Sequence, residues 1–156
     1  MRKQRVYFET TIFNYYFQPE RDAHRATLHL FSALEQGKLE VFTSQFVIDE
    51  LMLAPSPKRE QMLELIARYG IPVLQPSEEA AKLAVLYLET GALPPASTAD
   101  SLHIAIASVY GLDLIISLNF EHIVRQRTRR MTAAVNTLYG YSAVEILSPM
   151  EVDWNE

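Results

Sequence analysis

Residues 98–123 read TADSLHIAIASVYGLDLIISLNFEHI, and this stretch decides the fold. Its first half has the apolar spacing of a helix from about Thr98 to Gly111, where the glycine predicts the helix end. Leu112 to Ser117 follows at once as the most apolar strand of the chain, which is typical of a central strand buried on both faces of a parallel sheet. A buried helix leading straight into a buried strand predicts an α/β fold.

The rest of the chain alternates between the same two patterns. Further strands are predicted, from short β-rich apolar runs, at 6–8, 39–43, 71–74 and 143–147. Helices are predicted, from periods near 3.6 residues and from Ser, Pro and Gly at their ends, at 23–35, 44–54, 58–69, 77–91 and 130–139. This alternation predicts a mostly parallel sheet with helices on its faces.

The composition bounds the class of protein. With 156 residues, 49% of them hydrophobic and 21% charged, the chain can bury a sizeable core, and we expect a single domain over 1–156. It has no cysteine, so any metal must be held by oxygen or nitrogen ligands. The net charge of −5 argues against nucleic-acid binding by bulk charge alone, although a local basic patch could provide it.

The sequence shows neither a secretion signal nor a membrane span. The N-terminal run is basic and then apolar, but Glu9 interrupts it and no small-residue cleavage site follows. No segment approaches the roughly 18 uninterrupted apolar residues that a span needs. We therefore expect a cytoplasmic protein with no membrane partner, and the lack of cysteine fits that compartment.

Four polar residues fall where an apolar strand ends or a helix begins, although long intervals of sequence separate them. They are Glu9, Glu50, Asp100 and Asn119. Because the carboxyl ends of parallel strands share one edge of a sheet, these side chains are placed where α/β folds carry their chemistry. Oxygen ligands of this kind suit Mg²⁺. The pattern predicts one acidic metal site.

Two of the acids also have simpler interpretations. Glu9 could be a surface acid beside a helix N-terminus, where the helix dipole favours negative charge. Glu50 lies on the flank of the apolar face of its helix, whereas Asp49 points almost directly away from that face. Glu50 can therefore bend over the top of the sheet or extend to water, and Asp49 is expected to face solvent.

The other two positions have capping interpretations. Asp100 stands third after Ser97, in the pattern of a capping box, and Asn119 could cap a helix that follows it. His103 and His122 lack metal-ligand spacing, and a histidine beside an apolar face is more often a hydrogen-bonded structural residue. Both histidines are therefore left outside the predicted set of metal ligands.

Taken in order, four short motifs resemble those of the PIN domain family, in its branch of VapC-like ribonuclease toxins. They are YFETT at 7–11, SQFVIDEL at 44–51, ADSLHIA at 99–105 and LNFEHI at 118–123. The resemblance covers nearly the whole chain. It implies a three-layer α/β/α sandwich, a Mg²⁺- or Mn²⁺-dependent endoribonuclease and an RNA substrate. It further implies a role as the toxin of a type II toxin-antitoxin pair, with an antitoxin protein as partner, and a homodimer.

Carried over residue by residue, the resemblance gives each position a role. Glu9, Glu50, Asp100 and Asn119 occupy the four acidic positions in order, and Thr11 stands where a small hydroxyl residue supports a water of the metal. The metal ligands would be Glu9, Asp100 and Glu50. The commonest first residue is Asp and the fourth is often Asp, so Glu9 and Asn119 mark a variant of the pattern. With three carboxylates and not four, one resident ion is expected.

Substrate contact needs positive charge near the site. The chain supplies Arg125, Arg127, Arg129 and Arg130 just after the fourth motif, and these are predicted to bind RNA phosphates. An ordinary solvated helix surface explains them equally well. The rival to the enzyme as a whole is a catalytically inactive PIN-fold module that binds a protein, with its acids acting only as caps.

Overall fold

A computed structural model describes residues 2–152, so that residue 1 and residues 153–156 of the predicted domain lie outside the described residues. The strands are β1 (Gln4–Phe8), β2 (Leu39–Ser44), β3 (Val73–Leu74), β4 (Leu114–Ile116) and β5 (Glu145–Leu147). The helices are α1 (Thr10–Tyr15), α2 (His24–Glu35), α3 (Gln45–Leu51), α4 (Lys58–Arg68), α5 (Glu78–Glu89), α6 (Thr98–Val109) and α7 (Gln126–Leu138). A short 3₁₀ helix, η1 (Pro149–Glu151), follows β5.

The five strands form one sheet in the order β3-β2-β1-β4-β5. Every pairing in it is parallel, and Val6 of β1 faces Val41 of β2 on one side and Leu114 of β4 on the other. The predicted fold class, a mostly parallel sheet in an α/β sandwich, is therefore confirmed. After β1 the next strands, β2 and β3, are added on one side of the sheet, and after β4 the next strand, β5, is added on the other side. The direction in which strands are added therefore reverses between β1 and β4. Such a switch point is where open α/β sheets place their ligands, beyond the carboxyl ends of the strands.

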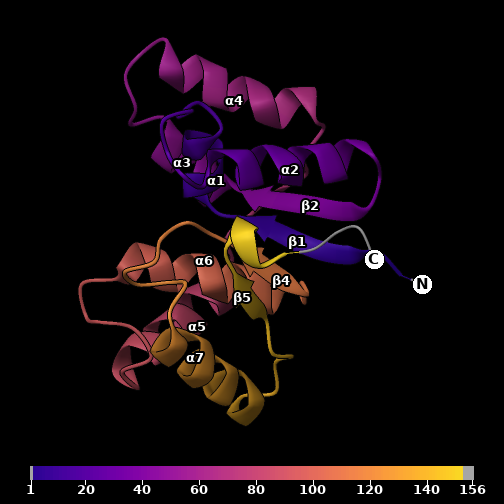
Figure 1. Cartoon of the computed structure of the whole chain (residues 1–156). Helices are drawn as coiled ribbons and strands as arrows, with labels where there is room; N and C mark the ends of the chain where they lie inside the picture. Colours follow the sequence, from indigo (N-terminus) through magenta and orange to yellow (C-terminus); the bar gives the residue numbers. More distant parts are fainter. Residues whose placement is uncertain (1, 153–156) are drawn as a thin grey trace.

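The helices form two groups, one on each face of the sheet. Figure 1 shows α1 to α4 together on one side of the molecule and α5 to α7 together on the other. This separation follows from the strand order, because connections between parallel strands are right-handed and the two halves of the sheet are built in opposite directions. Residues of both groups therefore meet at the ends of β1 and β4.

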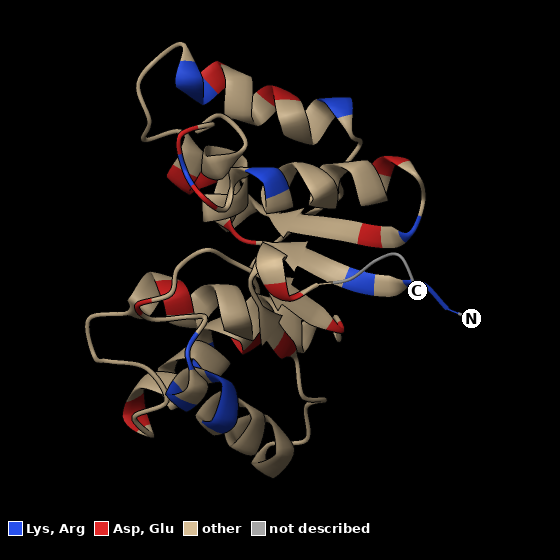
Figure 2. Ribbon diagram, viewed as in Figure 1, with Lys and Arg blue, Asp and Glu red and all other residues tan. Residues whose placement is uncertain are grey.

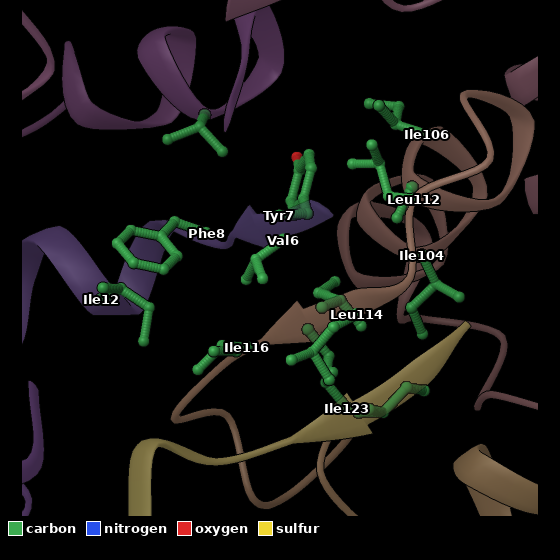
Figure 3. Close-up of a cluster of buried hydrophobic side chains, with 14 of the residues drawn as sticks. Val6, Tyr7, Phe8, Ile12, Ile104, Ile106, Leu112, Leu114, Ile116 and Ile123 are labelled. Atoms are coloured by element: carbon green, nitrogen blue, oxygen red, sulfur yellow. The ribbon is translucent and has the colours of Figure 1, made fainter. Parts of the chain in front are cut away.

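Alternation along β1 divides the core between the two faces. Phe8 packs edge-to-face against Phe13 and Phe31 of the first helix group, whereas Tyr7 points to His103 of α6. Figure 3 shows Tyr7 and Val6 on opposite sides of the strand. All these side chains are buried, and each large apolar one contributes about 1.5–3 kcal/mol by leaving water. The core thus fixes the end of β1 from both sides.

The elements differ from the prediction mainly at their ends. Helix α1 was not predicted, and it forms because Glu9 caps the start of the residues that follow β1. Helix α7 begins at Gln126, four residues before the predicted 130, directly after the extended Arg125. Strand β3 is limited to Val73–Leu74, since Pro72 before it cannot donate a ladder hydrogen bond. The strand predicted at 112–117 is β4, and it is buried on both faces as expected although β1 is the central strand.

Within residues 2–152 no helix has the length and apolar character needed to cross a lipid bilayer.

Candidate active site

Glu9 directly follows β1 and is the N-cap of α1. Its backbone is extended, at φ −79° and ψ 162°, and its side chain is only 4% exposed. Oε1 accepts hydrogen bonds from the Thr11 amide at 3.2 Å, the Thr11 hydroxyl at 2.5 Å and the Ser117 hydroxyl at 2.6 Å. Glu9 is therefore a buried carboxylate held in one position, and the alternative interpretation of Glu9 as a surface acid is wrong.

Thr11 and Ser117 connect the end of β1 to the end of β4. The Thr11 hydroxyl accepts from the Leu118 amide at 2.8 Å, and the Ser117 hydroxyl accepts from the Asn119 amide at 3.0 Å. The Glu9 amide also donates to the Ile116 carbonyl at 3.2 Å. These contacts fix the position of Glu9 relative to the loop after β4.

Glu50 lies on α3, which Ser44 caps at the end of β2. Its Oε1 accepts from the Thr10 hydroxyl at 2.5 Å and lies 2.6 Å from Nε2 of the buried His103. Asp49 is exposed, as predicted. Glu50 thus bends over the end of the sheet and does not extend to water. Burial alone would raise the pKa of Glu50, but the hydrogen bonds from His103 and Thr10 lower that pKa below its usual range.

Asp100 lies in the first turn of α6, Asn119 lies in the loop after β4, and their side chains contact each other. The Asn119 amide group donates to Asp100 Oδ1 at 2.9 Å, and its Oδ1 accepts from the His122 backbone at 3.1 Å. Ser97 makes no side-chain capping bond, so the capping-box interpretation of Asp100 is wrong. No helix follows Asn119, only turns, although its side chain does cap the first of them. Asn119 therefore joins that loop to Asp100.

The local environment is unfavourable for a charge on Asp100. Partial burial raises its pKa, and the negative charge of Glu50 adds to this effect. The two nearby histidines and Asn119 act in the opposite direction but do not outweigh it. Asp100 and Glu50 are thus close enough to repel each other, and a cation between them would relieve the repulsion.

The five predicted site residues form one connected set. Hydrogen bonds lead from Thr11 to Glu9, through Ser117 to Asn119, and on to Asp100. Glu50 is joined through Thr10, the residue next to Glu9. Glu9 and Glu50 come from one half of the sheet and Asp100 and Asn119 from the other, so the site lies at the switch point between β1 and β4.

The donor atoms suit a hard divalent cation. In each of Glu9, Glu50 and Asp100 one carboxylate oxygen makes the hydrogen bonds described above, and the other has no hydrogen-bond partner within residues 2–152. Over the same residues, no group of three or more acidic, His or Cys side chains is close enough to enclose an ion. Mg²⁺ does not require such a cage, because it keeps several waters and binds through one or two carboxylates plus phosphate oxygens.

Two residues close in sequence to Asp100 and Asn119 have an unpartnered polar atom. They are the hydroxyl of Ser101 and Nδ1 of His122, both buried and without a hydrogen bond inside the described part of the chain. An unsatisfied buried polar group costs about 1–3 kcal/mol.

The four predicted RNA-binding arginines lie on and before α7, where Figure 2 shows a concentration of blue segments. Arg125 donates to the Glu121 carbonyl at 3.3 Å, Arg127 donates to the Gly91 carbonyl at 3.2 Å, and Arg129 pairs with Glu151 at 2.7 Å. None of these bonds reaches an acid of the site. Arg130 is exposed. Phosphate binding by these arginines stays a prediction.

A cavity of about 570 Å³ lies elsewhere, at the amino ends of the strands. Its lining includes Arg2 and Lys3 before β1, Asp113 before β4, and Arg129. This edge of the sheet is opposite to the one that carries Glu9. The acids therefore lie at an open edge of the sheet and outside this cavity.

Three residues of the site were not in the predicted set. Ser117 and Thr10 donate to the acids, and His103, which the sequence left as structural, contacts Glu50. His103 carried a usable signal, because it stands one helical turn after Asp100 and so shares its face of α6. Thr10 stands between Glu9 and Thr11, and Ser117 stands two residues before Asn119, but neither gave a pattern of its own.

Comparison with known proteins agrees with this architecture. The sequence model of the PIN domain family matches residues 6–125. No curated protein matches the chain. One similar solved structure is VapBC2 of Rickettsia felis, solved bound to a DNA fragment from their promoter, at 13% identity over 93% of this chain and 98% of that chain, with a TM-score of 0.60. Another is VapC20 of Mycobacterium tuberculosis, described as a sarcin-ricin loop cleaving toxin, at 16% identity over 70% of this chain and 86% of that one, with a TM-score of 0.54.

At these identities the solved structures show the fold alone. The family match is stronger, because it spans most of the chain and includes Glu9, Glu50, Asp100 and Asn119. With the fold, the switch-point site and this match in agreement, the chain belongs to the PIN domain family.

Proposed function

We propose that this protein is a divalent-metal-dependent endoribonuclease that cleaves single-stranded or structured RNA. The observation that carries the proposal is the connected set of three carboxylates at the switch point of a PIN domain, from Glu9 and Glu50 on one side to Asp100 on the other. No Lys or Arg in residues 2–152 pairs with any of the three. Their charge is thus available for a cation.

Each residue has a distinct role in this proposal. Asp100 and Glu9 hold Mg²⁺ or Mn²⁺, and Glu50 orients the water that attacks the phosphodiester. Asn119 keeps Asp100 in position through its amide and adds no charge, while Thr11 fixes Glu9. A divalent cation, when bound, supplies charge that stabilises the scissile phosphate as negative charge builds on it.

The RNA substrate and the partner are supported by likeness only. VapC20, which shares the fold, is described as cleaving the sarcin-ricin loop, an RNA target. The VapBC2 likeness supports a second part of the proposal, that this chain is the toxin of a type II pair, held by an antitoxin protein. A homodimer stays a prediction from the resemblance of the motifs. We propose that Arg125, Arg127, Arg129 and Arg130 contact RNA phosphates, of which Arg127 and Arg130 are exposed.

The experiment compares two acids that differ in position only. Asp100→Asn should lower Mn²⁺-dependent cleavage of a structured RNA at least about 100-fold. Changes to residues that only hydrogen-bond a metal ligand already cost about 10–100-fold, and Asp100 is proposed to bind the ion directly. Asp49→Asn removes an exposed acid from α3 and should cleave at the unmodified rate. Equal rates for Asp100→Asn and the unmodified protein would refute the assignment.

The rival, an inactive protein-binding module, is favoured by one observation. One carboxylate oxygen of Glu9 caps α1 and accepts a hydrogen bond from Ser117, as in an acid with a purely structural role. Calorimetry separates the two functions. The enzyme requires Mn²⁺ or Mg²⁺ binding at millimolar concentration or below, and the module requires none.

A further inference from the structure

A chain of hydrogen bonds runs through the core to Glu50. The Ser44 hydroxyl lies 2.8 Å from the Tyr7 hydroxyl, which lies 2.7 Å from His103 Nδ1, and His103 Nε2 lies 2.6 Å from Glu50 Oε1. Ser44, Tyr7 and His103 are at most 1% exposed. The chain therefore reaches from the cap of α3, across β1, to α6 and back to α3.

One placement of hydrogens satisfies every group in this chain. The Ser44 oxygen already accepts from the Val47 amide at 3.1 Å, so its hydroxyl is free to donate to Tyr7. Tyr7 then donates to Nδ1 of His103, and the hydrogen on Nε2 donates to Glu50. The reverse direction would leave the Ser44 hydrogen buried without an acceptor among the described residues, at a cost of about 1–3 kcal/mol.

Tyr7 is held in one place in the core. Its ring is fully buried and packs against His103, with the ring centroids 5.8 Å apart. The position of its hydroxyl, between Ser44 and His103, is therefore fixed.

The contact matters because Glu50, unlike the buried Glu9, is partly exposed. Its side chain is 29% exposed and extends from the flank of a short helix. Without a partner it would have several rotamers that point to water. Thr10 and His103 bind the same oxygen, Oε1, and leave Oε2 without a hydrogen bond among the described residues.

We propose that His103 is a positioning residue, which holds Glu50 through Nε2 while Tyr7 and Ser44 hold His103 through Nδ1. This inference rests on the proposed function of Glu50 and adds a second layer to it. His103 touches neither ion nor substrate. Its effect on cleavage passes through the orientation of Glu50, as outer partners of metal-site ligands do in general.

Two amide variants separate the two ring nitrogens. His103→Gln reaches as far as Nε2 and can still donate to Glu50. His103→Asn ends near Nδ1 and can accept from Tyr7 but cannot reach Glu50. We expect His103→Asn to weaken Mn²⁺ binding, measured by calorimetry, and RNA cleavage by about 10-fold or more. His103→Gln should recover both to within about threefold. His29→Asn, at an exposed histidine of α2, is the matched control.

The folded state is checked in each variant by cooperative thermal unfolding. Tyr7→Phe removes only the hydroxyl that directs His103, and it should give a loss between those of the two amide variants. His103→Asn with unmodified Mn²⁺ affinity and rate, or His103→Gln no better than His103→Asn, would overturn the positioning role.

A measurement on the unmodified protein is independent of activity and metal. Nitrogen-15 NMR of the labelled histidines, assigned by the signal lost in His103→Asn, should show the ring hydrogen on Nε2. A hydrogen on Nδ1 alone would overturn the inference, because Nε2 could not then donate to Glu50. If the unmodified protein neither binds Mn²⁺ nor cleaves RNA, the proposed function is refuted. If it does both and His103→Asn changes neither Mn²⁺ affinity nor the cleavage rate, only the positioning role is refuted.

Discussion

At the scale of single residues, Asp100 shows the conflict between binding a cation and stabilising the fold. Its carboxylate is half-buried beside Glu50, and it receives a hydrogen bond from the Asn119 amide but no pairing with Lys or Arg in the described chain. One amide bond does not offset the loss of water and the nearby negative charge. The metal-free site therefore stores unfavourable energy at this residue, as functional sites commonly do.

This conflict predicts that Asp100→Asn stabilises the metal-free protein while it abolishes cleavage. The pKa of Asp100 is higher in the folded state than in the unfolded state. The protonated side chain therefore contributes stability at pH values below the unfolded-state pKa, and this contribution is lost as the pH rises through the folded-state pKa. Asparagine has no such loss and can still accept from Asn119. In EDTA at pH 7 the variant should melt at a higher temperature, and the difference should vanish near pH 3.5, below the usual pKa of Asp. A lower melting temperature at pH 7 would contradict the argument.

The Ser117 hydroxyl gives a second prediction at this scale. It is buried, donates to Glu9 at 2.6 Å and accepts from the Asn119 amide at 3.0 Å. Ser117→Ala leaves that amide without its partner, so the free energy of unfolding in urea should fall by about 1–3 kcal/mol. Ser142→Ala, at an exposed serine, should stay within about 0.5 kcal/mol. Equal losses in the two variants would show that the contact has no special weight.

At the scale of elements, the strands and most helices follow from local pattern. The strand at 39–43, the helix at 58–69 and the helix opened by Ser77 were predicted within two residues, since periodicity and end signals lie close together in the sequence. Helix α1 was missed because its cap, Glu9, depends on Ser117 from the other end of the chain. The same limit applies to the site, whose acids were predicted but whose partners required knowing which helix packs on which strand.

Asp113 carries a prediction about how β1 and β4 begin. Its carboxylate accepts from the Arg5 amide at 2.8 Å and from the Arg2 guanidinium at 2.9 Å. The hydrogen bond of Arg2 is the main cause of a lowered pKa at Asp113, and partial burial opposes it. Because the pKa of Asp113 is lower in the folded state, its carboxylate contributes stability at pH values above the unfolded-state pKa. This contribution is lost as the pH falls through the folded-state pKa.

The variant Asp113→Asn should therefore be less stable than the unmodified protein at pH 7, by no more than about 1 kcal/mol because the pair is partly exposed. The difference should disappear in acid. Urea unfolding across a pH series measures both, with Glu145→Gln at the exposed start of β5 as control. A difference that persists unchanged below the folded pKa would exclude the carboxylate as its source.

At the scale of the whole molecule, the site joins the two halves of the sandwich. Glu9 and Glu50 belong to the group of α1 to α4, and Asp100 belongs to the group of α5 to α7 (Figure 1). Hydrogen bonds between the halves at this edge include those of Ser117 with Glu9, of His103 with Glu50 and of the Leu118 amide with Thr11. An ion bound by acids from both halves would thus stabilise the whole folded domain. Its effect would not be limited to one loop.

Mn²⁺ should accordingly raise the melting temperature of the whole domain in one cooperative transition. At a concentration 100 times its dissociation constant, a ligand of the folded state adds about 2.7 kcal/mol. For a chain of this size that corresponds to a rise of roughly 5–10 °C, measured by calorimetric scanning. Asp100→Asn should lose most of the rise and Asp49→Asn should keep it, because only Asp100 faces Glu50 across the two halves. A rise of equal size in all three proteins would mean that Mn²⁺ binds elsewhere. No rise in melting temperature at 10 mM Mn²⁺ would mean that the carboxylates do not bind the ion.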